Sequence, residues 1–117
     1  MTIVYNVRMK SLYHLCDRVD WQEAQAQGEY RPSSLAQEGF IHCSTPEQVV
    51  ATANRFYHER RGLVLLTIDR GRVRPEVRFE PADGSLFPHV YGPLNMDAVV
   101  NAQEFEPGED GTFSWTA

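Results

Sequence analysis

The chain has 117 residues, the length of a single domain, and its hydrophobic content of 42% and charged content of 23% are those of an ordinary globular protein. The formal net charge of −5 disfavours general binding to nucleic acid or to an anionic membrane, because both require a basic surface. Two cysteines are too few for a disulfide scaffold, and no apolar run approaches the roughly 20 residues that span a membrane. We therefore expect one soluble, cytoplasmic domain over residues 1–117. Its translation start, Met1 or Met9, and its oligomeric state stay open.

Turn residues and hydrophobic periodicity predict the N-terminal half as strands that alternate with short helices. Gly28 and Gly39 are typical residues for ending a helix, and Thr45 followed by Pro46 is a typical helix start. In chain order we expect an extended stretch over residues 3–16, as one strand or two, a helix over 21–27, a helical turn over 34–38, a strand over 40–44, and a helix that begins at 45 and ends before 62.

The C-terminal half is predicted to consist of strands. The expected elements are a central strand over residues 63–69, which is the most hydrophobic run, a short strand over 77–80, a mixture of strand and turn over 86–94, and a last strand over 98–105. The tail over residues 107–117 is polar and expected to be loose, although Phe113 and Trp115 could dock it. This order of elements predicts the mixed α+β class.

Three of the four histidines, His14, His42 and His89, lie in stretches that are expected to be extended. Residues i and i+2 share a face of a strand, so His42 is expected beside Ser44, and His89 beside Tyr91. The same rule places Arg78 beside Glu80. If these faces converge, they form a cleft of imidazoles, hydroxyls and aromatic walls, which is the composition of a small-molecule site.

Each of these features also has a structural interpretation. A histidine in a strand is often a structural residue that hydrogen-bonds a main-chain carbonyl. Arg78 and Glu80 could form a surface ion pair of little energetic value, and Gly92 belongs to a turn with Pro93. We predict no metal site, because the His and Cys residues lack the spacing of zinc ligands and adjacent residues of a strand point to opposite faces. No glycine-rich phosphate loop is present in the sequence.

Several strings of residues together resemble a known family. They are Leu12-Tyr13-His14-Leu15, Tyr30-Arg31-Pro32-Ser33-Ser34-Leu35, Glu38-Gly39-Phe40-Ile41-His42-Cys43-Ser44, Val77-Arg78-Phe79-Glu80 and Leu86-Phe87-Pro88-His89-Val90-Tyr91-Gly92-Pro93-Leu94. Over residues 12–105 the chain is similar to the bacterial domain-of-unknown-function 952 family, which is grouped with the ADP-ribosyltransferase-like fold. The resemblance implies two small, mostly antiparallel sheets that form a cleft with two or three flanking helices. In enzymatic members of that fold, the cleft holds NAD.

The resemblance implies roles for particular residues. It implies that the ligand is NAD or a related ribose-phosphate compound, and that the reaction is transferase-like. The implied catalytic residues are His14, His42, Glu80 and His89, and the implied ligand-binding residues are Ser44, Tyr57, Arg78, Tyr91 and Gly92. Arg78, together with Arg31, would meet phosphate. The RNA 2′-phosphotransferase branch of the fold uses His and Arg, and His14, His42 and Arg78 loosely resemble that set. The alternatives are a non-catalytic module that binds a small metabolite or a peptide, and histidines that complete a polar core.

Overall fold

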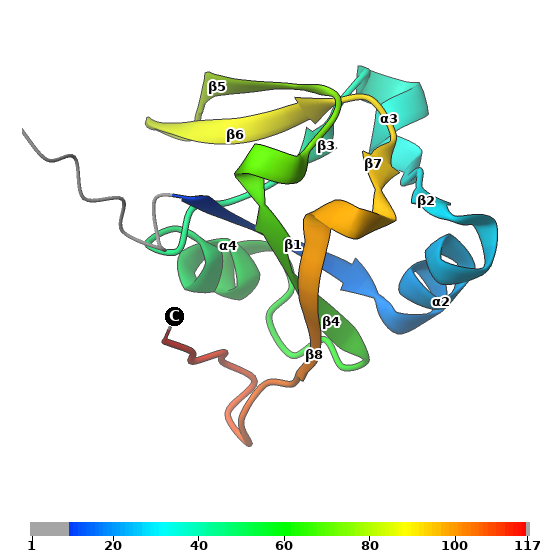
Figure 1. Ribbon diagram of the computed structural model, residues 1–117. Coiled ribbons are helices and arrows are strands. Elements are labelled where there is room, and N and C mark those ends of the chain that lie inside the picture. The colour runs from blue at the N-terminus through cyan, green and yellow to red at the C-terminus, as the bar shows by residue number, and fades with distance from the viewer. Residues whose placement is uncertain (1–9, 117) are drawn as a thin grey trace, which may run out of the picture.

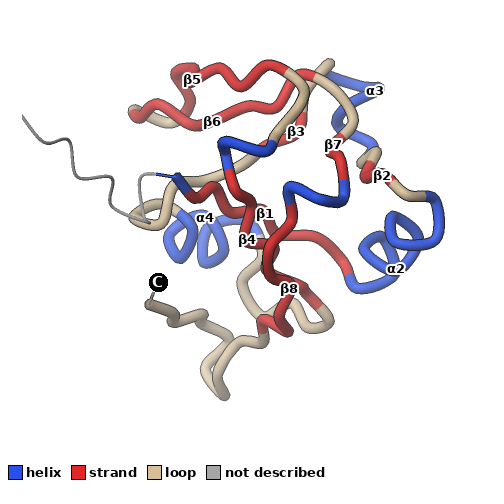
Figure 2. Tube along the Cα trace, in the orientation of Figure 1, coloured by secondary structure: helices blue, strands red, loops and turns tan. Residues whose placement is uncertain are grey.

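The computed structural model describes residues 10–116, in which short helices separate the strands of the N-terminal half and the C-terminal half consists mainly of strands (Figures 1 and 2). In chain order the elements are β1 (Ser11–Asp17), α2 (Arg18–Gln27), β2 (Glu29–Tyr30), α3 (Ser33–Glu38), β3 (Ile41–His42), α4 (Val49–Phe56), β4 (Leu63–Asp69), a 3-10 turn (Arg70–Arg72), β5 (Glu76–Ala82), β6 (Ser85–Tyr91), β7 (Leu94–Asn95), a second 3-10 turn (Met96–Ala98) and β8 (Val99–Phe105). The expected α+β class is confirmed. The first part of the extended stretch expected over residues 3–16 lies outside the described residues.

The strands form two three-stranded sheets and one two-stranded sheet, all of them antiparallel. The first sheet has the order β1-β4-β8, so the hydrophobic strand over residues 63–69 is central, as predicted. The second sheet has the order β3-β6-β5, and the smallest pairs β2 with β7. None of the helices within residues 10–116 is long and apolar enough to cross a membrane.

The β1-β4-β8 sheet has a hydrophobic core on each face, because side chains alternate along its strands. One core includes Leu12 and Leu66 and extends to Ile41 and Val90 of the second sheet. The other core includes Leu65 and packs against α4. The first sheet is therefore held between the second sheet on one side and α4 on the other, and its edge strand β1 lies where the two sheets meet.

Strands β5 and β6 form a longer hairpin than the sequence predicted. Asp83 and Gly84 connect them with φ angles of 50° and 81°, as in the type I′ turn that Asp-Gly favours between strands. Pro88 lies in β6, the central strand, which explains why this segment was expected to mix strand with turn. The carbonyl of Pro88 accepts a hydrogen bond from the main-chain N–H of Cys43 at 3.0 Å. The nitrogen of Pro88, which has no hydrogen to donate, points to the same side, toward the end of β3, where the ladder stops.

The C-terminal tail differs from the expected loose segment. It has no helix or strand within residues 107–116, yet the ring of Phe113 is buried and stacks on Phe105 with centroids 5.0 Å apart. The Asn54 side chain bonds both main-chain groups of Phe113, at 2.7 and 3.1 Å. The ring of Trp115 packs edge-on against Tyr13. The two aromatic residues named as possible anchors thus dock the tail beside α4 (Figure 1).

Candidate functional site

The two three-stranded sheets meet at a single main-chain bridge between β1 and the end of β3. Tyr13 and Ser44 exchange two main-chain hydrogen bonds of 2.8 Å each. Beyond this pair the strands diverge, since β3 pairs instead with β6, where His42 lies opposite His89. The sheets are therefore nearly continuous at one point, and a gap opens beside it.

The side chain of His14 crosses this gap. Its Nδ1 lies 2.5 Å from the main-chain oxygen of His42, and its Nε2 lies 2.7 Å from the hydroxyl of Tyr30. A carbonyl oxygen only accepts, so Nδ1 carries the proton and Nε2 accepts from the tyrosine. Burial lowers the pKa of His14 to about 4 and raises the pKa of Tyr30, which keeps both groups neutral.

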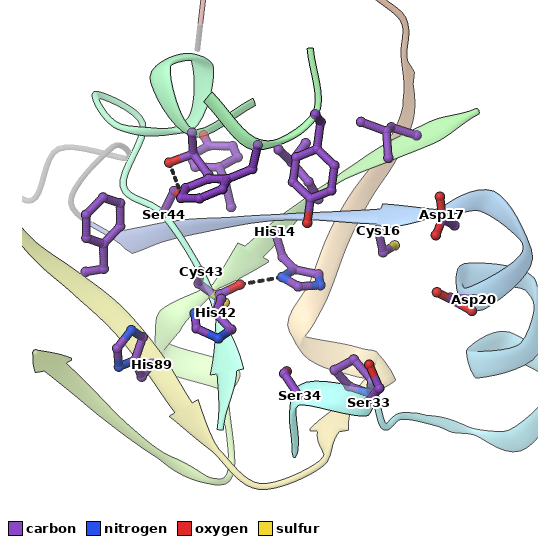
Figure 3. Close-up of a pocket in the computed structure, with 18 of the residues that line it drawn as sticks. His14, Cys16, Asp17, Asp20, Ser33, Ser34, His42, Cys43, Ser44 and His89 are labelled. Carbon is purple, nitrogen blue, oxygen red and sulfur yellow. Dashed lines mark hydrogen bonds between the residues drawn. The ribbon is translucent and has the colours of Figure 1, made fainter. Parts of the chain in front are cut away.

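A cavity of about 580 Å³ occupies the gap and runs along the edge of β1 (Figure 3). It is lined by Tyr13, His14, Leu15, Cys16, Asp17, Asp20, Tyr30, Pro32, Ser33, Ser34, His42, Cys43, Ser44, Thr52, Phe56, Tyr57, Arg60, Leu63, Ala82, Asp83, Phe87 and His89. In Figure 3, His14 and Cys16 extend from β1 toward the side of His42, whereas Ser44 lies across the strand. The size and the aromatic walls are those of a small-molecule site.

His89 is held by a carboxylate on the neighbouring strand. Its Nδ1 lies 2.9 Å from Oε1 of Glu80, and the hydroxyl of Tyr91 donates to the same oxygen. These two hydrogen bonds, the one from Tyr91 first, lower the pKa of Glu80, so the carboxylate is ionised and Nδ1 of His89 must be the donor.

The other ring nitrogen of His89 is open to the cavity. Every fully buried side-chain nitrogen or oxygen within residues 10–116 has a hydrogen-bond partner. The Nε2 atom of His89 has no partner in that range, although the side chain is only 7% exposed. This atom is therefore not fully buried, and His89 is one of the residues that line the cavity.

His42 is a second imidazole held by a carboxylate. Its Nε2 lies 2.6 Å from Oε2 of Glu38, four residues earlier on α3. The rings of His42 and His89 are 5.4 Å apart, centre to centre, and lie side by side in Figure 3. Phe40 stacks on His89 at 4.1 Å and meets His42 edge-on, which fixes the planes of both rings.

The structure brings five of the predicted site residues to the cavity wall: His14, His42, Ser44, Tyr57 and His89. The hydroxyl of Ser44 lies 3.4 Å from that of Thr52, and burial raises the pKa of Tyr57. Glu80 and Tyr91 lie outside the lining and act on it through His89.

Two predicted ligand-binding residues lie away from the cavity. Arg78 packs over the ring of Tyr91 at 4.4 Å and forms an exposed ion pair with Glu76 rather than with Glu80, the partner considered from the sequence, because Glu80 is held by His89 and Tyr91. A Cβ on Gly92 would lie 3.0 Å from Pro75, so this glycine allows close packing of main chain against that proline. The expected phosphate-binding residue Arg31 pairs with Glu29 and is not among the cavity residues.

Several cavity residues were not singled out in the sequence. The hydroxyl of Tyr30, for example, donates a hydrogen bond to Nε2 of His14. Arg60 contacts both carboxylate oxygens of Asp17, at 2.6 and 2.7 Å, and lies over the ring of Tyr57. No residue spacing signals these contacts, because they join segments far apart in the chain.

The two thiols in the cavity wall are buried. Burial raises the pKa of Cys16 and of Cys43 to about 12, so both stay protonated. Residues 10–116 contain no group of three or more His, Cys, Asp or Glu side chains that could hold a metal ion.

Comparisons with known proteins agree with this fold. The family of proteins of unknown function called DUF952 matches residues 15–102. The crystal structure of protein CC0527 from Caulobacter crescentus is 31% identical in sequence, has a TM-score of 0.80, and aligns with 89% of this chain and 93% of its own. The solution NMR structure of CC0527 is 30% identical with a TM-score of 0.78, and covers 89% of this chain and 91% of its own. No curated protein matches the chain.

Proposed function

This chain belongs to the DUF952 family, and we propose that the cavity between β1 and β3 is an active site for general acid–base chemistry on an organic ligand. His89 and His42 are the groups that move protons. The proposal rests on one observation: two imidazoles, 5.4 Å apart at the cavity, are each held by a carboxylate through one ring nitrogen.

His89 has the position of a general base. Glu80 accepts from Nδ1 and so leaves the lone pair of Nε2 facing the cavity. A carboxylate that orients a buried imidazole in this way fixes the tautomer and stabilises the imidazolium that forms when Nε2 takes a proton. Tyr91 holds the same carboxylate oxygen and so limits rotation of Glu80.

His42 has the position of the partner acid. Its side chain is 54% exposed, which gives it access to water, and Glu38 holds its Nε2. His14 has a different part: both of its nitrogens are already bonded, to His42 and Tyr30, so it shapes the cavity without a free nitrogen.

The reaction class we propose is hydrolysis or group transfer, in which a base activates water or a hydroxyl and an acid protonates the leaving group. The charge of the lining disfavours a ligand with a pyrophosphate: the lining holds three aspartates, and its one arginine, Arg60, is paired with Asp17. NAD and ADP-ribose, which the family resemblance suggested, therefore enter as test ligands for a transferase reaction and not as the favoured substrates.

The test uses one substrate for each kind of bond: p-nitrophenyl acetate for an ester, bis-p-nitrophenyl phosphate for a phosphodiester, and NAD for an N-glycosidic bond. We expect turnover of at least one, with kcat reduced about 10²-fold or more in His89→Gln and at least about tenfold in Glu80→Gln. The exposed His58 gives a matched control, His58→Gln, with unchanged turnover. If the wild type turns over none of the three faster than His89→Gln does, the proposal is wrong.

The alternative hypothesis, that the protein is a non-catalytic binding module, predicts a different result for the same variants. A module that only binds would retain its affinity in Glu80→Gln, because Glu80 lies outside the cavity wall, and would show no turnover in any variant. Calorimetry with NAD, ADP-ribose and nicotinamide at millimolar concentration, run beside the turnover assay, separates binding without chemistry from catalysis.

A further inference from the structure

Strand β1 has one edge bonded to β4 and another edge that faces the cavity. The five consecutive residues from Tyr13 to Asp17 all line the cavity, although their side chains alternate between the two faces of the sheet. A cavity that touches both faces of a strand lies beside its edge, which is the place of a neighbouring strand.

The main-chain groups that face this edge follow from the bridge to Ser44. Tyr13 exchanges both of its main-chain hydrogen bonds with Ser44, so its N–H and C=O point away from β4. In an antiparallel pair, alternate residues direct both groups to the same side. The N–H and C=O of Leu15 and the N–H of Asp17 therefore also point away from β4, toward the cavity, whereas the C=O of Asp17, the N-cap residue of α2, accepts within that helix.

The N–H and C=O of Leu15 and the N–H of Asp17 have no main-chain partner in the described part of the chain. Continuing the register of Tyr13 and Ser44 would place Leu15 opposite His42, but the strands have diverged and no hydrogen bond joins the two main chains. The oxygen of His42 bonds instead to the imidazole of His14. Main-chain groups at a buried position require a partner, which is water or a ligand when the protein supplies none.

We propose that the site binds an extended peptide segment that pairs with the open edge of β1 at the N–H and C=O of Leu15 and at the N–H of Asp17. An extended residue presents N–H and C=O on one side with the spacing that such an edge requires, so strand addition completes the ladder. The cavity spans the edge from Tyr13 to Asp17, about 13 Å at about 3.3 Å per residue, which suits roughly four peptide residues. This inference names the substrate class of the active site and rests on the proposed function for its location.

The charges around the cavity favour a neutral or basic peptide. Asp17 is paired with Arg60 and Asp83 with Arg55, whereas Asp20 has no ion pair within residues 10–116. A lysine side chain of the peptide would meet this free carboxylate at the rim. An acidic peptide would find no unpaired cation among the lining residues.

Amide hydrogen exchange tests the pairing directly. The probes are N-acetylated, C-amidated Val-Lys-Val-Thr, its Val-Glu-Val-Thr counterpart, and uncharged Val-Thr-Val-Thr. In the free protein, we expect the Leu15 amide to exchange at least about tenfold faster than the His14 amide, which faces β4. The lysine peptide should slow exchange at Leu15 at least about tenfold and leave His14 unchanged.

Methylated peptides decide whether binding is by strand pairing. Methylation of successive peptide nitrogens should abolish binding at alternate positions only, because alternate N–H groups face β1. On the protein, Asp20→Asn should weaken the lysine peptide several-fold and leave the uncharged peptide unchanged, whereas Glu23→Gln on the same helix should change neither.

Failure of this inference is distinct from failure of the proposed function. If no probe slows exchange at Leu15, or if Leu15 is already as protected as His14 in the free protein, the strand-addition site is wrong whatever the turnover assay gives. If the lysine peptide protects Leu15 equally in the wild type and in Glu80→Gln, the peptide site stands even where no turnover is found.

Discussion

The imidazole Nδ1 of His14 donates a hydrogen bond to the main-chain oxygen of His42 over 2.5 Å, and this bond joins the two three-stranded sheets where their strands separate. One side chain thus replaces the main-chain ladder that would otherwise continue beyond the Tyr13–Ser44 bridge. Because Tyr30 bonds the other ring nitrogen, His14 joins three segments at the base of the cavity.

Replacing His14 with alanine is expected to destabilise the protein. The change leaves the hydroxyl of Tyr30 and the oxygen of His42 without their partner, at a cost of about 1–3 kcal/mol for each buried group that stays unpaired. Urea unfolding measures the loss, with His58→Ala as the control, for which we expect a change within about 0.5 kcal/mol. Equal stability of the two variants would contradict a joining role for His14.

The free energy of unfolding should decrease as the pH is lowered through a window set by His14. Its pKa is about 4 in the folded protein against an ordinary value of 6.5, so between these values the unfolded chain binds a proton that the folded protein does not. The contribution is complete above about pH 6.5 and is lost as the pH falls toward 4, with a slope of at most about 1.4 kcal/mol per pH unit.

Chemical unfolding of the wild type and of His14→Gln from pH 8 to pH 4 isolates this contribution, because glutamine does not titrate. The contribution of Glu80 to the free energy of unfolding is also lost in acid, because its pKa is lowered. That loss occurs below the ordinary pKa of 4.5, and both proteins share it. A parallel pH dependence of the two proteins would contradict the assignment to His14.

The site residues that share a strand face were predictable from the sequence. The two-residue period places His42 beside Phe40, and His89 beside Tyr91, and the structure shows these four rings in contact. The pairing of neighbouring strands then brings Glu80 to His89. Local geometry fixes such relations, so a single sequence carries them.

The cavity itself was not predictable, because it depends on where two strands part. No residue of β1 or β3 signals that the hydrogen bonding between the two strands stops after one pair. The contacts of Tyr30 with His14 and of Arg60 with Asp17 could therefore not be predicted. Gly92 has a φ of 154°, which residues with a side chain rarely adopt, but the sequence does not reveal that Pro75, rather than a ligand, is the close neighbour. The Asp83-Gly84 turn did carry a signal, and it defines the hairpin more sharply than hydrophobicity alone.

Phe113 is expected to anchor the tail. Its side chain is 3% exposed and stacks on Phe105, so Phe113→Ala should lower the free energy of unfolding by about 3–5 kcal/mol. The variant should also be cut faster by protease within residues 107–116, since the bonds to Asn54 depend on the docked main chain. Ser114→Ala, at an exposed neighbouring position, is the control. If both variants unfold at the same urea concentration, the docked tail contributes little.

Glu80 is expected to set the tautomer of His89. In the wild type near pH 8, nitrogen NMR of the imidazole should find the proton on Nδ1 and a bare Nε2, because the ionised carboxylate accepts from Nδ1. Glu80→Leu removes the acceptor and should move the proton toward Nε2, which then no longer presents a lone pair to the cavity. The matched control is Glu76→Leu, since Glu76 lies on the same strand but pairs only with Arg78 in the described residues. A proton found on Nε2 in the wild type would remove the base from the cavity. The same tautomer in all three proteins would show that Glu80 does not orient the ring.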